Sequence, residues 1–334
     1  MGIRAVPRPE VYETFWKFAC ERQRIFEQRI AGLPGPWTDD PILRTYKFCN
    51  AFRASDRVSQ YLIRDVIYDG EERSAEDTVL RIVLFRLFSR ERTWELIEEL
   101  TGGLSVATFD EQAIGRMLDD EMDADRRIYT SAFILCANSA FGHARKHANH
   151  LSLISTMLKG GALWKAVEAS DSLEAVYNAL LAYPLIGPFM AYQIATDLNY
   201  SEVIDFSEDE FTVAGPGSER GIRKVFLDTG GARNAEIILD MVDRQEDACD
   251  ELGLVPPTLF GRRLHAIDVQ NLFCEVDKYC RVAFPELASN RTKIKATFVP
   301  SSAPLQLFYP PKWGVDYSGK VGSGARELAA AGRH

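Results

Sequence analysis

The stretch 183–198, YPLIGPFMAYQIATDL, sets two prolines and a glycine between segments with helical apolar spacing. Proline is tolerated in the first turn of a helix, where no N–H donor is needed, so Pro188 predicts a helix over 188–198. A preceding helix over 172–183 leads into the turn at 184–187. The stretch therefore predicts a helical hairpin, which is either an ordinary connection in a helical fold or a grip for a nucleic-acid backbone.

Helical periodicity continues through most of the chain, whereas strand-like alternation is confined to three short runs. We therefore expect an all-α fold. The expected helices cover 11–30, 46–68, 75–88, 92–100, 125–141, 147–161, 172–183, 188–198, 232–248 and 265–284, and the strand-like runs are 202–206, 211–215 and 295–299.

Neither an internal repeat nor a linker divides the chain. We expect one helical unit over 1–315, with its hairpin at 173–198 and two helical lobes around a cleft, in keeping with the usual size of domains. The Gly/Ala-rich segment 316–334 is predicted to be a disordered tail.

Composition places the chain among globular proteins, because 334 residues with 46% hydrophobic content suffice for a buried core. The absence of a long apolar run and of a signal-peptide pattern makes the cytoplasm the expected location. Six cysteines without any C-x-x-C spacing favour reduced thiols and argue against a zinc ribbon.

A net charge of −9 is unusual for a nucleic-acid-binding protein, whose phosphate contacts normally require an excess of basic residues. The charge is uneven, however. Residues 1–64 hold eleven Lys/Arg against seven Asp/Glu, a surplus of four. The sequence leaves open whether this acidic protein has a basic surface.

The hairpin carries a first resemblance. Pro184, Gly187 and Ala191 resemble the proline, second glycine and alanine of the helix-hairpin-helix of DNA glycosylases, although Leu185 stands where that motif has its first glycine. The resemblance implies that the hairpin contacts DNA backbone through Ile186 and Gly187. Independently, a glycine at 187 permits a conformation or a close approach that a Cβ would prevent.

The same superfamily places an essential acid about twenty residues beyond the glycine, where this chain has SEVIDFSEDEF. The resemblance points to Asp205, Glu208 and Glu210 as catalytic acids. Phe189 occupies the place of the lysine that forms a Schiff base in bifunctional members, which implies an enzyme without β-lyase activity.

A second resemblance spans about residues 45 to 282. The chain resembles the helical, glycosylase-like family of phage thymine-hypermodification enzymes, which includes helical domains of 5-hydroxymethyldeoxyuridine DNA kinases and amino-acid:DNA transferases. Five motifs carry it in order: YKFCNAFRASDRVSQYLIRDVIY, RIVLFRLFSRERTWELI, YPLIGPFMAYQIATDLNYS, FSEDEFTVAGPGSERGIRKVF and LFCEVDKYCR. The family's acid pair falls on Glu208 and Glu210.

Such enzymes build positive charge on a carbon of the substrate, and a carboxylate in a dry pocket stabilises that charge. The target base must also leave the duplex stack. NAFRASDR places Asn50, Arg53 and Arg57 at helical spacing with Asp56 beside them, as base-binding residues or as a structural Arg–Asp pair.

On the expected helix after the hairpin, Tyr192 and Gln193 either read the base or pack within the protein. AGPGSERG supplies Gly215, Gly217 and Ser218 as a candidate phosphate site at a helix start.

No Walker A motif occurs, so we expect no kinase activity. His143, His147 and His150 share one helical face, but no carboxylate lies in that run, so we expect no bound metal. No cofactor is expected either.

The leading expectation is a monomeric, monofunctional DNA glycosylase. It would excise a hypermodified pyrimidine derived from 5-hydroxymethyluracil, from double-stranded phage DNA, as antiviral defence. The alternative is a transferase that displaces pyrophosphate from an activated 5-hydroxymethyldeoxyuridine and attaches an amino acid or amine. A DNA-binding module with structural acids is a third possibility.

Overall fold

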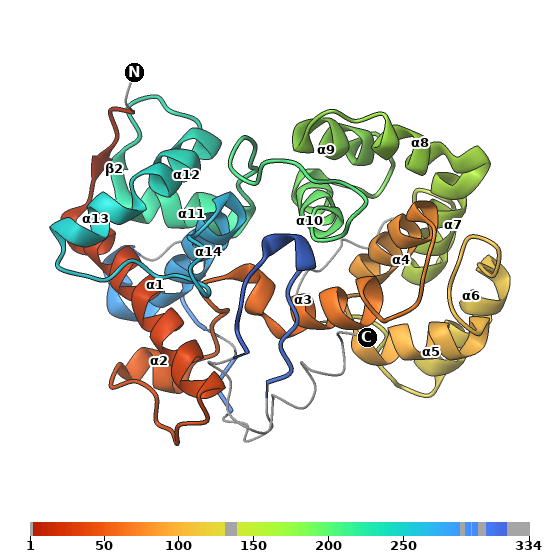
Figure 1. Ribbon diagram of the computed structural model, residues 1–334, viewed down its shortest axis with the longest axis horizontal. Helices are drawn as coiled ribbons and strands as arrows, with labels where there is room; N and C mark the ends of the chain where they lie inside the picture. Colours follow the sequence, from red (N-terminus) through yellow and green to blue (C-terminus); the bar gives the residue numbers. More distant parts are fainter. Residues whose placement is uncertain (1–2, 131–138, 288–290, 295, 300–304, 319–334) are drawn as a thin grey trace. The chain divides into compact units, whose positions relative to one another are not determined.

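The computed structural model describes residues 3–130, 139–287, 291–294, 296–299 and 305–318 (Figure 1). Within these ranges, regular strands are confined to an antiparallel pair, Val6–Pro7 (β1) and Phe226–Asp228 (β2), and the rest of the regular structure is helical. The expected all-α fold is confirmed. From residue 319 onward, the predicted tail lies outside the described residues.

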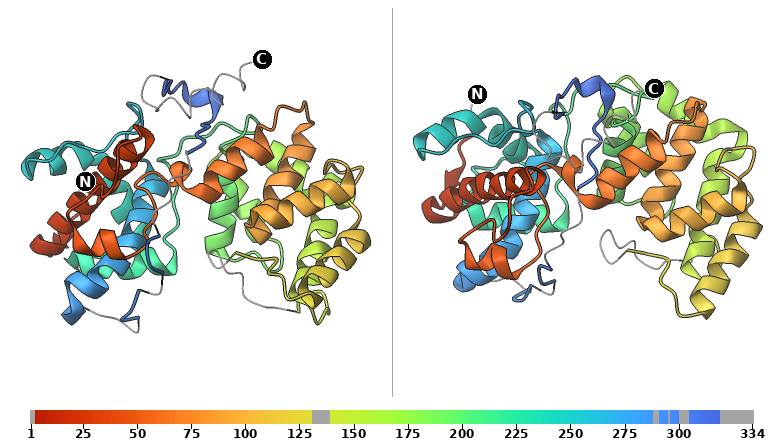
Figure 2. Two further views of the ribbon diagram at one scale, coloured as in Figure 1. Left: turned by 90° about the horizontal axis from the view of Figure 1, so that it is seen from below. Right: turned by 60° about the horizontal axis from the view of Figure 1, so that its bottom comes forward.

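Two compact units make up the chain (Figure 2). Unit 1 combines residues 1–56 with 208–334, and unit 2 is the continuous segment 57–207. The expectation that residues 1–315 fold as one unit stays a prediction, since two compact parts can still unfold cooperatively. No described helix is both long enough and apolar enough to traverse a bilayer.

Unit 1 is built around a long helix near its C-terminal end. Its elements are α1 (Pro9–Ile30), α2 (Pro41–Thr45), the 3-10 turn Arg53–Ser55, α11 (Pro216–Val225), α12 (Asn234–Asp243), α13 (Gln245–Glu251), α14 (Ala266–Ala283), and the 3-10 turns Pro285–Leu287 and Pro311–Trp313. α14 contacts α1, α11 and α12, so it forms the centre of this unit.

Two glycines of α11 allow it to approach α14 closely. A Cβ on Gly221 would stand 2.0 Å from the carbonyl oxygen of Phe273, and one on Gly217 would stand 2.3 Å from Sγ of Cys274. The ring of Phe15 in α1 lies 4.7 Å from the ring of Phe273 in α14. Backbone proximity therefore sets the position of α14.

Unit 2 is arranged around α4. Its elements are α3 (Arg57–Tyr61), the π-helical turn Leu62–Ile67, α4 (Ala75–Phe88), α5 (Glu91–Thr101), α6 (Glu111–Asp123), α7 (Lys146–Leu158), the 3-10 turn Lys159–Gly161, α8 (Ala162–Glu168), α9 (Leu173–Leu181) and α10 (Pro188–Leu198). Every residue of α4 from Val79 to Phe88 is buried, as in a helix packed on all sides. α5, α7, α8 and α10 contact it (Figure 1).

An ion pair without solvent exposure joins α4 to α10. Nε and Nη2 of Arg86 each donate to the carboxylate of Asp197, the latter at 2.9 Å, and both side chains are 0% exposed. Such a pair is costly to break, because either partner alone would be a charge in a low-dielectric interior.

The hairpin forms as expected, with α9 and α10 joined by a short turn. Leu185 adopts φ +68°, the left-handed conformation that glycine accepts most readily, while Gly187 has φ −88°. Of the two alternatives for Gly187, the conformational one is therefore wrong, because other residues also adopt φ −88°. Apart from its chain neighbours, no atom of the described residues lies within 4 Å of its ideal Cβ, so close approach by a ligand stays a prediction.

The continuous helix expected over 46–68 is wrong. Residues 46–52 are extended or bent, and the helices begin only with the turn at Arg53–Ser55. Backbone N–H groups that a helix would use are taken by acidic side chains, because Asn50 N donates to Asp56 and Arg53 N donates to Asp268. Side-chain acceptors thus outcompete helical hydrogen bonds here.

Smaller expectations also fail. The runs 202–206 and 211–215 contain no regular strand, and residues 125–130 and 139–141 are not helical. Residues 131–138, the middle of that predicted helix, lie outside the described residues.

We expect Gly221→Ala to destabilise the protein, although alanine normally favours a helix over glycine. The new Cβ would collide with the backbone of α14, so the free energy of unfolding should fall by about 1–3 kcal/mol in urea denaturation. Gly187→Ala is the matched control, with open space around its Cβ, and should change stability little. Equal effects would contradict the close approach of the two helices.

We expect Asp197→Asn to lower the free energy of unfolding by about 3–5 kcal/mol, because the buried charge of Arg86 would lose the carboxylate that accepts two of its hydrogen bonds. Urea unfolding followed by circular dichroism measures the change. The control is Glu95→Gln, which removes one half of the exposed pair with Arg92 and should cost less than about 1 kcal/mol. A loss no larger than the control's would show that the pair is unimportant.

Candidate active site

Unit 1 joins two of the predicted motifs at the first turn of α14. Asp268, in that turn, accepts a hydrogen bond from Arg53 N at 2.7 Å and one from His265 N at 3.1 Å. His265 precedes the first residue of the helix. One carboxylate therefore holds the Asn50–Asp56 loop against the start of α14, where the helix dipole favours negative charge.

Asp209, from the predicted acidic segment, reaches the same helix start. Its two oxygens accept hydrogen bonds from Ala266 N at 2.9 Å and from Nδ1 of His265 at 2.8 Å. This contact requires the tautomer with a proton on Nδ1, which leaves Nε2 to exchange protons when the ring is neutral. The pair has the hydrogen-bonding pattern of a carboxylate–imidazole dyad.

The two groups of the dyad shift each other's pKa. Burial alone would lower the pKa of His265, but the hydrogen bond to Asp209 and the nearby charge of Glu208 outweigh it and raise the pKa. Burial would raise the pKa of Asp209, but the bond and charge of His265 outweigh it and lower the pKa. Both shifts favour the charged pair.

Glu208 lies one residue before Asp209 and forms an ion pair with Arg262. The guanidinium of Arg262 also lies over the ring of Trp313, 4.0 Å from its centroid. Two adjacent carboxylates thus face two cationic or ionisable groups of the segment 262–265. Glu208 and Asp209 are both mostly shielded from solvent, with 15% and 33% of their side chains exposed.

The other predicted loop is held by its own polar contacts. Asp56 accepts from Asn50 N at 2.8 Å, and burial raises the pKa of Asp56 to about 6. The Asn50 amide donates to Ser55 O at 2.7 Å and accepts from Arg22 at 3.1 Å. Burial likewise raises the pKa of Asp268 to about 6.

These contacts give Asn50 a structural role within the loop, and the expected helical face of Asn50, Arg53 and Arg57 is wrong. Arg53 is buried in unit 1. Arg57 begins α3 in unit 2, where its exposed side chain lies 3.5 Å from Glu91. The three residues do not share a helix because the carboxylates of Asp56 and Asp268 accept hydrogen bonds from the backbone N–H groups of this loop.

The remaining predicted acids differ in exposure. Glu210 follows Asp209 in unit 1 and is exposed, and Asp205 is exposed in unit 2. Tyr192 and Gln193 are buried in α10, at 1% and 2% exposure, which favours the packing alternative for both.

The predicted phosphate-binding residues divide between the units. Ile186 is buried and Gly187 exposed at the hairpin of unit 2. Gly215 precedes α11 in unit 1, Gly217 faces α14, and Ser218 is 0% exposed. Close packing explains Gly217, and phosphate binding stays a prediction.

The sequence does not predict the residues that complete the site. Asp209 is in the acidic run, but nothing there distinguishes it from its neighbours. Arg262, His265 and Asp268 lie in GRRLHAID, 261–268, where an acid three residues after the residue preceding a helix is a familiar capping pattern. The pattern indicates a helix start, and it does not reveal which loop meets it.

The three histidines tested for metal binding have separate partners. Nε2 of His143 lies 2.9 Å from Ser152, Nε2 of His147 lies 2.9 Å from Asp119, and Nδ1 of His150 lies 2.9 Å from the hydroxyl of Tyr129. No cluster of three or more metal-ligating side chains occurs among the described residues.

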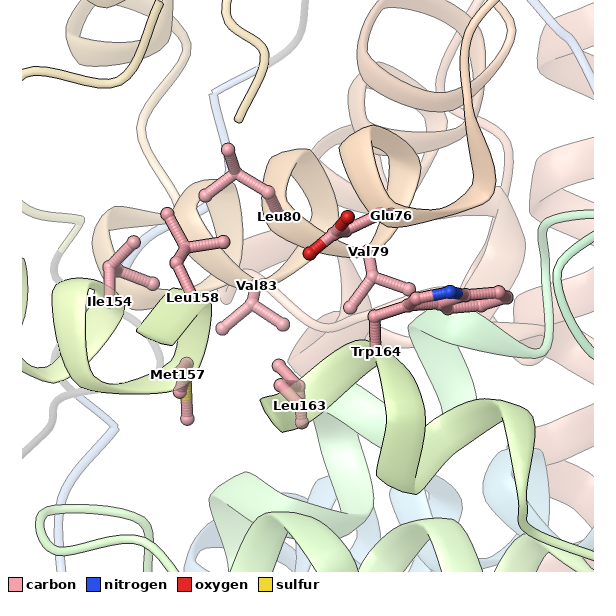
Figure 3. A pocket seen from close by; sticks show the side chains of 9 residues that line it. All are labelled: Glu76, Val79, Leu80, Val83, Ile154, Met157, Leu158, Leu163 and Trp164. Carbon is pink, nitrogen blue, oxygen red and sulfur yellow. The ribbon is translucent and has the colours of Figure 1, made fainter. Parts of the chain in front are cut away.

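A pocket within unit 2 is chemically different (Figure 3). It is formed by α4, α7 and α8, and its empty volume of about 260 Å³ includes space open to solvent. Glu76 is the charged residue among its nine lining side chains, next to Trp164 and seven aliphatic or Met side chains. An apolar wall with one carboxylate offers no cation for a phosphate, so the site in unit 1 is the stronger candidate.

Comparisons with known proteins cover most of the chain. The family model described as "5-hmdU DNA kinase, helical domain" matches residues 9–289. A curated 5-hmdU DNA kinase of Bacillus phage SP10 is 28% identical over 303 residues, covering 83% of this chain and 47% of the relative. The chain thus spans about half the length of that relative. No solved structure matches it.

We expect Asp209→Asn to lower the pKa of His265, because the carboxylate charge that offsets burial is removed. A ¹H NMR titration of the imidazole protons should find a lower pKa for His265 in the variant than in the wild type. His147, whose pKa is lowered mainly by burial, is the control in the same spectra and should not move. An unchanged His265 would contradict the dyad.

Proposed function

The chain belongs to the family of the helical domain of 5-hmdU DNA kinases, and we propose that it transfers a group to a 5-hydroxymethyl-derived thymine in DNA. The substrate would be the base with its 5-hydroxymethyl oxygen activated as a diphosphate. An amino acid or amine would displace that diphosphate. The observation that carries the proposal is the pair of adjacent carboxylates, Glu208 and Asp209, each held by a group of the 262–265 segment.

The proposed reaction exchanges one bond at the 5-methylene carbon. The C–O bond breaks and the diphosphate leaves with the electron pair, while the amine nitrogen forms a new C–N bond and loses a proton. Positive charge develops on the methylene carbon. A carboxylate in a partly desolvated site stabilises such charge, and we assign that role to Glu208.

The amine's proton needs an acceptor. We assign it to Nε2 of His265, because Nδ1 is committed to Asp209, which orients the ring and stabilises the imidazolium. The raised pKa of His265 makes it a good proton acceptor once it is neutral, so the rate should increase as pH rises through that pKa. The target base would reach this site after leaving the duplex stack.

Base excision was the leading expectation from the sequence, and the comparisons favour the transferase alternative. The relative's name describes a kinase of 5-hmdU, and phosphorylation of that hydroxyl prepares a leaving group at the same carbon. The present chain has no Walker A motif, so we assign the phosphorylation step to none of its residues.

The test is incubation of the protein with duplex DNA carrying one 5-(diphosphoryloxymethyl)uracil, in a mixture of amino acids and polyamines. Digestion to nucleosides and mass spectrometry should find a nucleoside heavier than 5-hydroxymethyldeoxyuridine by the mass of the added amine less water, accompanied by released pyrophosphate. Abasic sites would instead support excision, and binding without any product would leave the helical domain as a DNA-binding module. Either result would overturn the transferase.

We expect Glu208→Gln to reduce the rate of product formation by about 10²–10³-fold, because the carboxamide cannot stabilise the developing cation. Single substitutions Asp205→Asn and Glu210→Gln, at the exposed acids, rank the remaining carboxylates in the same assay. The control is Glu251→Gln, at an exposed position at the end of α13, which should leave the rate within about twofold. An equal loss in test and control would dissociate Glu208 from catalysis.

A further inference from the structure

A tight turn presents Arg262 to the site. Leu259 and Arg262 exchange two backbone hydrogen bonds of 2.8 and 3.0 Å, and the central residues Phe260 and Gly261 have φ +53° and +94°. Two positive φ angles are typical of a type I′ turn. Gly261 adopts this conformation easily, whereas Phe260 pays a steric cost and needs surrounding contacts to stay there.

An aromatic segment provides those contacts. We name residues 307–318 the aromatic strap, a dark blue segment in Figure 1. The ring of Phe260 lies 5.8 Å from Tyr309 and 5.5 Å from Tyr317 of the strap. The hydroxyl of Tyr309 lies 2.9 Å from Oγ of Ser55, so the strap also contacts the Asn50–Asp56 loop. The family match ends at residue 289, before the strap begins.

Arg262 is positioned from two sides. Trp313 of the strap lies under its guanidinium, and Glu208 accepts from it. The next residue, Arg263, has different partners: it donates to Val242 O at 2.6 Å and to Glu246 at 2.9 Å. Two neighbouring arginines thus differ in surroundings, and only Arg262 contacts a proposed catalytic carboxylate.

We propose that Arg262, whose guanidinium lies over the ring of Trp313, is the residue that recognises the diphosphate on the target base and discriminates it from the unactivated hydroxymethyl group. This inference rests on the proposed function. A planar guanidinium binds phosphate oxygens through two parallel hydrogen bonds, and stacking on an aromatic ring fixes the plane in which they form.

The same contact explains why Arg262 pairs with Glu208. Without substrate, Glu208 neutralises the guanidinium. When the diphosphate arrives, its oxygens replace Glu208 as the partner of Arg262, and the carboxylate becomes available to the methylene carbon beside the leaving group. A single exchange of ion-pair partners therefore both recognises the diphosphate and releases the carboxylate of Glu208. This exchange involves no covalent step.

The test compares binding of two duplexes that differ at one base, 5-hydroxymethyluracil or its diphosphate, by fluorescence anisotropy without any amine. Wild-type protein should prefer the diphosphate duplex by about tenfold or more, the range of a charge-assisted bidentate contact. Arg262→Gln should lose that preference while binding the hydroxymethyl duplex within about threefold of wild type. Arg263→Gln is the matched control and should keep the preference.

Variants of Trp313 test whether its ring positions the guanidinium of Arg262. Trp313→Ala should reduce the preference for the diphosphate, and Trp313→Phe should restore most of it, because a phenyl ring retains a stacking face. Circular dichroism and the melting temperature identify any variant that misfolds. If Arg262→Gln misfolds, Arg262→Lys replaces it. Lysine keeps the positive charge but lacks the planar guanidinium with two parallel donors, so its preference for the diphosphate should lie between that of the wild type and no preference.

The outcomes separate this inference from the proposed reaction. Preference for the diphosphate that depends on Arg262, in a protein that yields no transfer product, supports recognition and overturns group transfer. Transfer with an undiminished preference in both Arg262 variants overturns the assignment of Arg262. Equal effects of Arg262→Gln and Arg263→Gln would overturn it too, since a general loss of positive charge would then explain both.

Discussion

The candidate site depends on the hydrogen bonds that the carboxylate of Asp268 accepts. It binds one backbone N–H from its own helix start and another from Arg53, more than 200 residues earlier in the chain. A buried N–H without an acceptor costs about 1–3 kcal/mol, so this one side chain determines where the early loop can stay. Burial raises the pKa of Asp268 to about 6, which is the electrostatic cost of placing it there.

From that contact the site extends in two directions. Toward the acidic segment, Asp209 satisfies the N–H of Ala266 and orients His265, and the adjacent Glu208 meets Arg262. Toward the loop, the carboxylate of Asp56 likewise accepts a hydrogen bond from a backbone N–H group, that of Asn50. Asp268, Asp209 and Asp56 accept from backbone groups, whereas Glu208, the candidate catalyst, accepts from the side chain of Arg262. Rigid placement of this kind suits the proposed reaction, in which positive charge develops on a carbon atom.

Much of the helical architecture was predictable, and the reason is local. The segments 75–88 and 188–198 were expected with the bounds observed, the first from its apolar spacing and the second from Pro188. The structure shows in addition that the side chain of Ser74 caps the first helix. The segment 46–68 has equally good helical periodicity, yet it is broken. One of its two competing acceptors, Asp56, lies within the segment, but the other, Asp268, lies 215 residues after Arg53, and no window of local sequence includes it.

The sequence by itself determined that the chain is helical, where its hairpin turns, and that acidic residues follow that hairpin, since these depend on apolar spacing, proline and glycine close together in the chain. Only the tertiary structure decided which acids have partners. Glu208 and Asp209 are paired by residues more than fifty positions away, while Glu210, beside them, is exposed. Pairing depends on which backbones pack together, and Gly217 and Gly221 against α14 set that arrangement through contacts remote in sequence.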